Sequence, residues 1–261
     1  MFKFAANLTF LFTELDFLER FSAAQKAGFK YVEFMFPYEF DQAEIGKQLD
    51  KHNLKMVLFN IPAGNWAEGD RGIAVDPARK DEFRDGVEEA ISSAQRFNVK
   101  QVNCLVGNTN ESESADALWN NLVDNIRFAA DELKAHGVNL LIEPINHHDI
   151  PGFYLNTTDQ VMKLISEVKK DNVYLQYDVY HAEREKEDHL AILKDKLHKI
   201  GHIQIADNPG RNQPGTGVID YTSLFKTIAE SNYNGYIAME YKPDPNTEAS
   251  LEWVTKYGYK L

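Results

Sequence analysis

The chain alternates eight times between a short run of β-branched or aromatic residues and a longer stretch with the period of an amphipathic helix. The short runs predict strands near residues 2–8, 31–36, 55–61, 101–106, 139–145, 173–180, 201–206 and 236–241. The longer stretches predict helices over residues 16–27, 42–52, 79–97, 114–136, 157–170, 186–198, 220–231 and 246–256. Alternation of this kind is typical of parallel βαβ units, and eight units match a closed (β/α)8 barrel in size. We therefore predict an α/β chain that forms one (β/α)8 barrel domain over residues 1–261.

An open, doubly wound sheet is the structural alternative to the barrel. That fold normally has a glycine-rich first turn that binds a nucleotide phosphate. The first turn here, ANLTFLFTELD, has no glycine, which favours the barrel. The long loop over residues 62–78 holds three glycines and two prolines, and it is either a lid or a plain surface insertion.

Charge and cysteine content narrow the classes of function. Asp and Glu number 40 against 28 Lys and Arg, and this net charge of −12 disfavours binding to nucleic acid or to an anionic membrane. The single cysteine, Cys104, excludes an internal disulfide and a cysteine metal cluster. No apolar run reaches the ~18–20 residues that span a bilayer. Lys3 and Asn7 interrupt the apolar N-terminal residues, which argues against a secretory signal. We expect a cytoplasmic protein.

Four polar residues lie near the ends of the last four predicted strands: Glu143, Asp178, Gln204 and Glu240. In a barrel, catalytic groups lie where the strands end, so these side chains are expected to converge at its mouth. A single buried carboxylate often has a structural explanation, but three of them would repel one another strongly without a cation. Oxygen donors suit Mg²⁺ or Mn²⁺ better than Zn²⁺. The pattern therefore predicts a divalent metal held by these four residues.

Four further residues are candidates for binding an acidic substrate. His181, three residues after Asp178, is expected at the rim, where it could donate a hydrogen bond to a substrate oxygen. Lys242, Arg211 and Arg71 could each pair with a substrate carboxylate. For Arg211 and Arg71 a solvated surface charge is the simpler interpretation, and for Lys242 the two interpretations are equally good.

Three other histidines carry weaker signals. His202 shares its strand parity with Gln204, and core packing is the better interpretation for it. His147 and His148 follow the fifth predicted strand and lie either at the mouth or on a surface loop.

The set of Glu143, Asp178 with His181, Gln204 and Glu240 resembles that of the xylose isomerase-like TIM barrels, which include sugar isomerases and epimerases. The chain is most similar to the hydroxypyruvate isomerase branch. That resemblance spans nearly the whole sequence and rests on the stretches FAANLTFLFTE, YVEFMFPYEF, NIPAGNWAEGDRGIA, NCLVGNT, LLIEPINHHDIPGFYL, QYDVYHAERE, HIQIADNPGRNQPGTGVIDY and MEYKPDPNTEASL.

The resemblance implies an isomerase that interconverts hydroxypyruvate and tartronate semialdehyde, with Glu143 and Glu240 as the catalytic residues. The wider superfamily commonly has His where this chain and its branch have Gln204, and a neutral amide oxygen is a poorer metal ligand. An enediol route would use the two glutamates as proton donor and acceptor, and a divalent ion would polarise the carbonyl.

Several alternatives stay open at this point. The 2-oxo-tetronate isomerases share much of the pattern, so a four-carbon oxo-acid is the rival substrate. A non-catalytic binder of sugar acids is the rival from another class. An abasic-site endonuclease is disfavoured, because that chemistry uses several zinc ions held by many histidines and a basic face. Barrels of this family often associate, so a homo-oligomer is one expectation.

Overall fold

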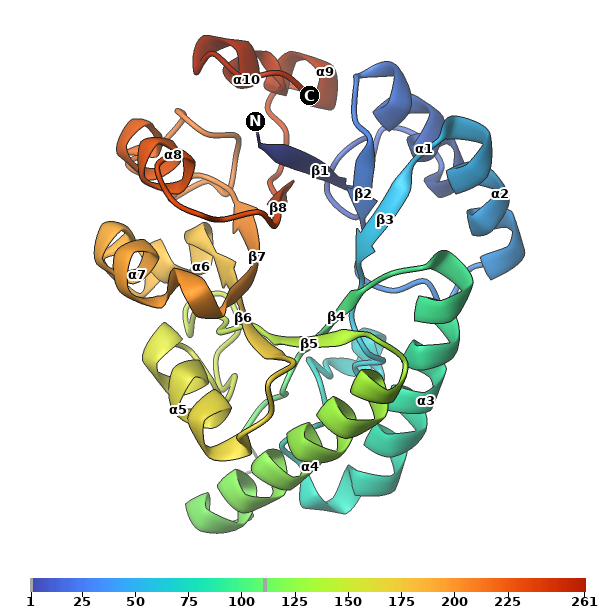
Figure 1. Ribbon diagram of the computed structural model, residues 1–261, viewed down its shortest axis with the longest axis vertical. Helices are drawn as coiled ribbons and strands as arrows, with labels where there is room; N and C mark the ends of the chain where they lie inside the picture. Colours follow the sequence, from blue (N-terminus) through green and yellow to red (C-terminus); the bar gives the residue numbers. More distant parts are fainter. Residues whose placement is uncertain (1, 110–111) are drawn as a thin grey trace.

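Eight parallel strands form one sheet in the computed structural model, which describes residues 2–109 and 112–261 (Figure 1). The strand order is β3-β2-β1-β8-β7-β6-β5-β4, so the first and last halves of the chain meet between β1 and β8. The strands are β1 (Lys3–Asn7), β2 (Tyr31–Glu33), β3 (Lys55–Leu58), β4 (Gln101–Cys104), β5 (Asn139–Ile142), β6 (Val173–Asp178), β7 (Ile200–Ile205) and β8 (Tyr236–Met239).

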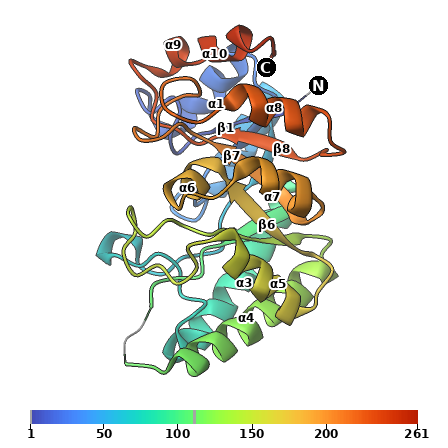
Figure 2. The same ribbon diagram turned by 90° about the vertical axis from the view of Figure 1, so that its left-hand side faces the viewer.

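Helices surround these strands on the outside (Figures 1 and 2). They are α1 (Phe17–Lys26), α2 (Gln42–His52), α3 (Lys80–Phe97), α4 (Ala115–Ala135), α5 (Thr158–Val168), α6 (Val179–Arg184), α7 (His189–Lys196), α8 (Tyr221–Ala229), α9 (Thr247–Ser250) and α10 (Glu252–Lys256). Short 3-10 helices occur at Trp66–Glu68, Pro77–Arg79 and Leu197–Lys199. The prediction of a (β/α)8 barrel is confirmed. Within the described residues, no helix is long and apolar enough to cross a membrane.

The helices form because their apolar stripes are buried and their ends are capped. In α5, the side chains of Thr157 and Gln160 make a reciprocal capping box with the backbone at the helix start. Val161, Leu164, Ile165 and Val168 form its buried face. Burial of each such side chain contributes about 1.5–3 kcal/mol relative to exposure.

Two predicted elements differ in the region after β6. The predicted strand 173–180 ends at Asp178, because the Asp178 carboxylate accepts the backbone N–H of Tyr180 and starts α6, a helix that the sequence pattern did not predict. The predicted helix 186–198 begins only at His189, where Asp188 caps it.

At the C-terminal end of the chain, the predicted helix 246–256 is divided into α9 and α10 at Leu251.

The barrel is joined most weakly between β3 and β4. Among the described residues these two strands share an isolated bridge, Asn60 with Asn103, instead of a ladder. The backbone N–H of Asn103 donates to Phe59, and that of Ile61 donates to Asn103. The barrel is therefore nearly closed, with a seam at this position.

The loops that follow β3, β4 and β5 are tied together above this seam. Gly72 in the first loop pairs with Val106 in the second, and Asn108 in the second pairs with Phe153 in the third. Figure 2 shows the first and third of these loops projecting from the same side of the barrel. They form one wall around the carboxyl ends of the strands.

The barrel interior changes from apolar to polar along its axis. Ala5, Val57, Leu58, Leu141 and Ala238 form a small apolar cluster inside it. Tyr31, Tyr174 and Tyr236 pack against that cluster near the amino ends of their strands. The polar side chains follow toward the carboxyl ends of the strands, where the candidate site lies.

Candidate active site

A cavity of about 150 Å³ lies at the carboxyl ends of the strands. At roughly 30 Å³ per water molecule, this space equals about five waters and suits a small substrate. Apolar side chains such as Phe10, Trp66 and Ile150 form part of its wall. Its polar lining residues are Asn7, Glu33, Asn60, Glu143, Asp149, Gln176, His181, Gln204, Arg211 and Glu240.

Strand alternation explains why so many polar groups face inward. Asp178 lies beside Gln204, and Gln204 beside Ala238, in the register of the last three strands. Gln176 and His202 are paired one step deeper and point to the same side. All four polar side chains on β6 and β7 are almost completely buried. Glu143 and Glu240 directly follow β5 and β8.

Side-chain amides hold one oxygen of each of the two glutamates: one amide binds Glu143, and two bind Glu240. Asn103 Nδ2 donates to Glu143 Oε2 at 3.0 Å. Asn7 Nδ2 donates to Glu240 Oε2 at 2.8 Å, and Gln204 Nε2 donates to the same oxygen. One oxygen of each carboxyl group is thereby fixed, and both groups line the cavity.

Arg211, from the loop after β7, brings a positive charge into this acidic pocket. Its Nη2 lies 2.6 Å from Glu240 Oε1 and 3.4 Å from Asp178 Oδ2. Its guanidinium lies between the rings of Phe10 and Tyr180, at 4.9 Å from each centroid. The guanidinium links two of the carboxylates that the sequence pattern brought together.

The loop that carries Arg211 is organised by Asp207. This buried carboxylate accepts the backbone N–H groups of Asn208, Gly215, Gly217 and Ile219. Such a carboxylate fixes the loop as a cap fixes a helix end. Arg211 itself has a left-handed backbone with φ +55°.

His181 lies in α6, close to Asp178, and its side chain is buried. Its Nε2 lies 3.6 Å from Asp178 Oδ2, and its Nδ1 lies 2.6 Å from Asn146 Nδ2. Burial, followed by the charge of Arg211, lowers the pKa of His181 well below its ordinary value. The imidazole is therefore neutral at pH 7, and it lines the cavity from a buried position, whereas the sequence pattern placed it at the rim.

The carboxyl groups are shifted in the opposite sense. Burial, and then the charge of Asp178, raises the pKa of Glu143 to about 8. Burial raises the pKa of Glu240 well above its ordinary value, although Arg211 opposes the shift. Burial also raises the pKa of Asp178. Three carboxyl groups that share one guanidinium retain protons or attract a cation.

A divalent cation fits part of the predicted ligand set. Oxygen or nitrogen atoms of Glu143, Asp178 and His181 lie within 4.8 Å of one another, and all three residues are buried. Gln204 differs from the prediction, because its amide nitrogen faces Glu240 and its oxygen accepts from Gln176. Glu240 Oε1 accepts a hydrogen bond from Arg211, and Glu240 Oε2 accepts from Asn7 and Gln204. Both oxygens of this predicted metal ligand are therefore already hydrogen-bonded.

Comparison with known proteins decides the family. The model of the xylose isomerase-like TIM barrel family matches residues 21–257. The chain belongs to the xylose isomerase-like TIM barrel family.

The similarity to individual members of this family extends over the full length. The chain is 49% identical over 257 residues to a hydroxypyruvate isomerase of Escherichia coli K12, covering 98% of this chain and 100% of that protein. It is 38% identical to a 2-oxo-tetronate isomerase of Haemophilus influenzae, covering 98% and 99%. These relatives support a ketol isomerase function, and the resemblance to the hydroxypyruvate isomerase branch is confirmed.

A solved structure has nearly the same fold. A crystal structure from Brucella melitensis, described as an AP endonuclease of family 2, superposes with a TM-score of 0.95. It is 38% identical in sequence, and the match covers 98% of this chain and 99% of that one. The chain fold of this family member and that of the present chain are therefore almost the same.

In the present chain, Lys242 and Arg71 do not line the cavity. The Lys242 side chain is exposed, and its backbone N–H donates to Arg211. The alternation argument fails for Lys242 because β8 ends at Met239, three residues earlier. The Arg71 guanidinium stacks on the Trp66 ring at 4.0 Å and donates to the Trp66 and Asp70 carbonyls. Arg71 thus supports a cavity residue without lining the cavity.

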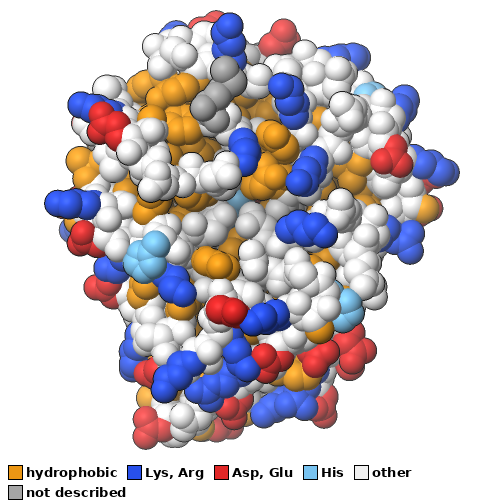
Figure 3. Space-filling view, viewed as in Figure 1, with side chains coloured by type: hydrophobic (Ala, Val, Ile, Leu, Met, Phe, Trp, Pro, Cys, Tyr) orange, Lys and Arg blue, Asp and Glu red, His pale blue; other side chains and the backbone are white. Residues whose placement is uncertain are grey.

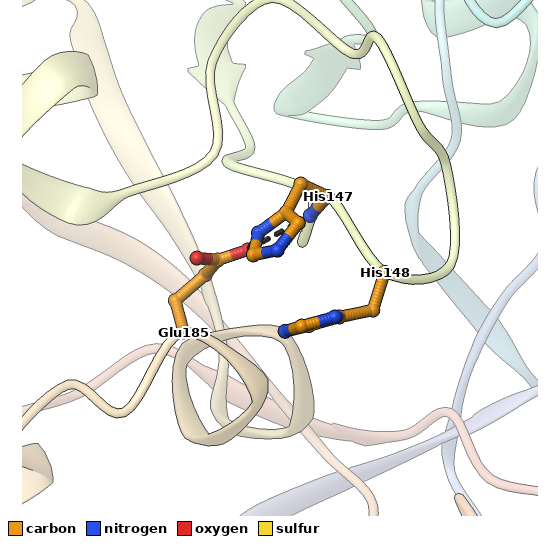
Figure 4. Close-up of side chains that lie close together, drawn as sticks. All are labelled: His147, His148 and Glu185. Carbon is orange, nitrogen blue, oxygen red and sulfur yellow. Dashed lines mark hydrogen bonds and ion pairs between the residues drawn. The ribbon is translucent and has the colours of Figure 1, made fainter.

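His147, His148 and Glu185 form a second cluster, on the surface (Figure 4). Glu185 Oε1 accepts the backbone N–H of His147 at 2.7 Å and lies 2.6 Å from His147 Nδ1. The His148 ring packs on the His147 ring with centroids 3.8 Å apart. Both histidines are exposed, and their contact with Glu185 ties the loop after β5 to the end of α6.

Polar residues of this barrel that the sequence pattern did not single out include Asn7, Glu33, Asn60, Asn103, Asp149 and Gln176, and His202 as a neighbour of Glu33. Glu33 lies within the apolar run YVEFMF, so the criterion that found Glu143 applies to it as well. Gln176 precedes Asp178 by two residues and therefore shares its face. Asn7 and Asn103 are uncharged, and a single amide in a strand gives only a weak signal.

Proposed function

We propose that the chain interconverts hydroxypyruvate and tartronate semialdehyde, which is the finer form of the ketol isomerase function. The observation that carries the proposal is the pair Glu143 and Glu240, two buried carboxyl groups that line one small cavity together with Arg211. A ketol isomerisation removes a proton from one carbon and returns one to the neighbouring carbon, and two carboxyl groups can divide these two tasks.

The reaction moves one carbonyl between adjacent carbons. One glutamate removes a proton from C3 of hydroxypyruvate as the C2 carbonyl becomes the oxygen of an enediolate. The C3 hydroxyl proton passes to that C2 oxygen as the C3 carbonyl forms, and the other glutamate delivers its own proton to C2. Proton exchange with solvent then returns the two glutamates to their starting forms. The raised pKa of Glu143, about 8, allows it to hold a proton near neutral pH.

Arg211 and His181 have the positions needed to bind the substrate oxygens. Arg211 is the cationic side chain that lines the cavity in the described part of the chain, so we assign it to the substrate carboxylate. A neutral His181 can donate or accept a hydrogen bond at a substrate oxygen. Lys242 and Arg71, which do not line the cavity, are left out of this assignment.

A divalent ion, Mg²⁺ or Mn²⁺, is part of the proposal. Glu143 and Asp178 would hold it, because their carboxylate oxygens lie within 4.8 Å of each other and of the His181 ring nitrogen that is assigned to the substrate. When bound, such an ion polarises the substrate carbonyl and stabilises the negative charge that develops on its oxygen. Arg211 also carries a positive charge in the cavity. The turnover that remains after the metal is removed by a chelator measures how much catalysis Arg211 supports without the ion.

The test is an isomerase assay on hydroxypyruvate before and after treatment with a chelator, followed by addition of Mg²⁺ or Mn²⁺. Turnover that falls on chelation and returns with one ion supports both parts of the proposal. Turnover that chelation leaves unchanged supports the glutamate mechanism and contradicts the metal. Absence of turnover with every addition contradicts the proposed reaction.

A four-carbon oxo-acid is the second candidate substrate, because relatives such as that of Haemophilus influenzae are 2-oxo-tetronate isomerases. The same assay with a 2-oxo-tetronate separates the two, since the better substrate has the higher kcat/KM. Binding of either acid without turnover would favour the non-catalytic binder.

A further inference from the structure

Glu33, at the end of β2, is a buried acid to which the proposed reaction assigns no role. Its side chain is 1% exposed and lies in the wall of the cavity. Its Oε1 accepts hydrogen bonds from Asn7 Nδ2 and Gln204 Nε2, both at 2.9 Å. Its Oε2 lies 2.7 Å from His202 Nε2. Three nitrogen atoms from two other strands, β1 and β7, therefore lie around one carboxyl group.

His202 is oriented from its other side. Gln101 Nε2 lies 3.2 Å from His202 Nδ1, and neither residue is appreciably exposed. An amide nitrogen can only donate, so Nδ1 accepts and the ring proton is on Nε2, facing Glu33. Asn7 and Gln204 thus donate to Glu33 Oε1, whereas His202 Nε2 lies near Glu33 Oε2 without forming a hydrogen bond to it.

The two amides that Glu33 binds are the same two that bind Glu240. Asn7 Nδ2 and Gln204 Nε2 both donate to Glu240 Oε2 as well as to Glu33 Oε1. Gln204 is fixed at its other end, because its oxygen accepts from Gln176 Nε2 at 2.7 Å. If either amide turned over, its oxygen would face two carboxylate oxygens, which repel it.

We propose that Glu33 is a positioning residue for Glu240. It fixes the carboxamides of Asn7 and Gln204 with their nitrogen atoms toward Glu240, so that Glu240 Oε2 is tethered and Oε1 faces Arg211. The effect on turnover rests on the proposed function, whereas the amide orientation does not. Gln204 in this role is a hydrogen-bond donor to a catalytic carboxyl group.

The kinetic test uses Glu33→Gln, Gln204→Met and the double variant. Glu33→Gln keeps the shape of the side chain and removes its charge, so kcat is expected to fall by about tenfold or more while KM changes less. Gln204→Met is expected to give a similar fall. Because both changes disturb the same contact to Glu240, the double variant is expected to lie within roughly threefold of the worse single variant.

Asn172→Ala is the matched control for a buried polar residue. Asn172 donates to the carbonyls of Ala130 and Val138 outside the cavity. Its removal is expected to lower Tm without lowering kcat. Unchanged kcat in Glu33→Gln, or falls in kcat that multiply in the double variant, would contradict the proposal. If Glu33→Gln does not fold, unchanged kcat in Gln204→Met contradicts it instead.

A spectroscopic readout separates this inference from the proposed function. In protein with ¹⁵N-labelled glutamine, the Gln204 side-chain NH₂ signals are expected to shift and to exchange faster with water in Glu33→Gln. In Asn172→Ala the same signals should stay in place. If the wild-type chain turns over neither acid, the proposed function fails, and the Gln204 signals alone decide the inference: unchanged signals overturn it.

Discussion

At the scale of residues, the site depends on amides that each hold one oxygen of a carboxyl group. Asn103 binds Glu143, and Asn7 with Gln204 binds Glu240. An amide donor restricts the rotation of a carboxyl group without neutralising it. The groups proposed for proton transfer are therefore held in position before a substrate arrives, which lowers the entropic cost of reaching the reactive geometry.

Replacement of either glutamate by its amide tests the assignment directly. Glu143→Gln and Glu240→Gln keep the side-chain shape but cannot transfer a proton, so kcat for hydroxypyruvate is expected to fall by about 10²–10⁴. The control is Glu132→Gln, which changes an exposed glutamate on α4. Circular dichroism should show the same fold in all three variants. Rates like those of wild type in both site variants would contradict the assignment.

The raised pKa of Glu143 predicts how stability depends on pH. Its pKa is about 8 in the folded chain and about 4.3 when unfolded, so the folded state binds the additional proton between these values. The stability that this group contributes is fully present below pH 4.3 and is lost as pH rises through 8. In the presence of a chelator, Glu143→Gln should therefore gain stability relative to wild type between pH 5 and pH 8, on the order of 3 to 4 kcal/mol.

Thermal melts of the two chains at both pH values measure this difference. Glu132→Gln should follow wild type at both values. A constant difference between Glu143→Gln and wild type would show that the buried carboxyl group is not protonated in the folded state.

The sequence predicted the residues whose charge stands out against an apolar strand, and it missed those that act through neutral amides. Glu143 and Glu240 were named from this pattern, and both line one cavity. Arg211 was one of several basic candidates, with a solvated surface charge as the simpler interpretation, and the structure instead places it in the same cavity. A search for charged residues in apolar strands cannot find Asn103, because its side chain is uncharged. Its hydrogen bond to Glu143 becomes evident only from the three-dimensional structure. Lys242 was misplaced because strand alternation was extended past the end of β8.

At the scale of elements, the loop between β3 and α3 forms part of the cavity wall through Trp66. The loop is held by Gly72, whose backbone N–H donates to Ala63 and which pairs with Val106. Gly72 has φ +107°, and a Cβ atom there would lie 1.9 Å from the Leu105 carbonyl oxygen. Backbone of the neighbouring loop therefore leaves no space for a side chain at this position.

Gly72→Ala is expected to displace this loop, costing several kcal/mol of stability and lowering kcat/KM, because Trp66 and Leu105 both line the cavity. Gly69→Ala is the matched control in the same loop. It has φ +104° but open space around its Cβ position, so about 1–2 kcal/mol of backbone strain is the whole expected cost. Chemical denaturation and steady-state kinetics compare the two, and equal losses would contradict the packing argument.

The elements themselves were largely predictable from hydrophobic period. The misses lie where a single polar side chain redirects the backbone. Asp178 starts α6 by capping Tyr180, and Asp188 starts α7. The local pattern after β6 contains no breaker such as proline, so periodicity alone gave one later helix there.

At the scale of the whole molecule, the count of eight strand and helix units predicted the barrel, and its closure is uneven. β6 and β7 share a ladder over four residue pairs, whereas β3 and β4 share one isolated bridge within the residues described. No strand pattern in the sequence distinguishes a tight pair from a seam, because the difference depends on how Asn60 and Asn103 meet. The Asn103 side chain also donates to Asn60 and to Glu143.

Hydrogen exchange is expected to follow this unevenness. The backbone amides of Ile61 and Asn103 at the seam should exchange faster than those of β6 and β7, because fewer neighbouring bonds must open together. A substrate analogue that binds Glu143 should slow exchange at the seam more than elsewhere. Exchange measured by mass spectrometry on the free and bound chain tests this, and uniform protection around the barrel would contradict it.

The crowding of acids around a lone guanidinium has a consequence for how quickly an anionic substrate arrives. Figure 3 shows charges of both signs over one face of the molecule, but the chain as a whole carries −12. Long-range repulsion therefore opposes diffusion of the acid toward Arg211, and dissolved salt weakens that repulsion. The kcat/KM for hydroxypyruvate should increase roughly two- to fivefold between 10 and 150 mM salt, the reverse of an electrostatically steered enzyme. A flat or falling dependence in stopped-flow or steady-state rates would mean that the local field at the barrel mouth, and not the total charge, governs capture.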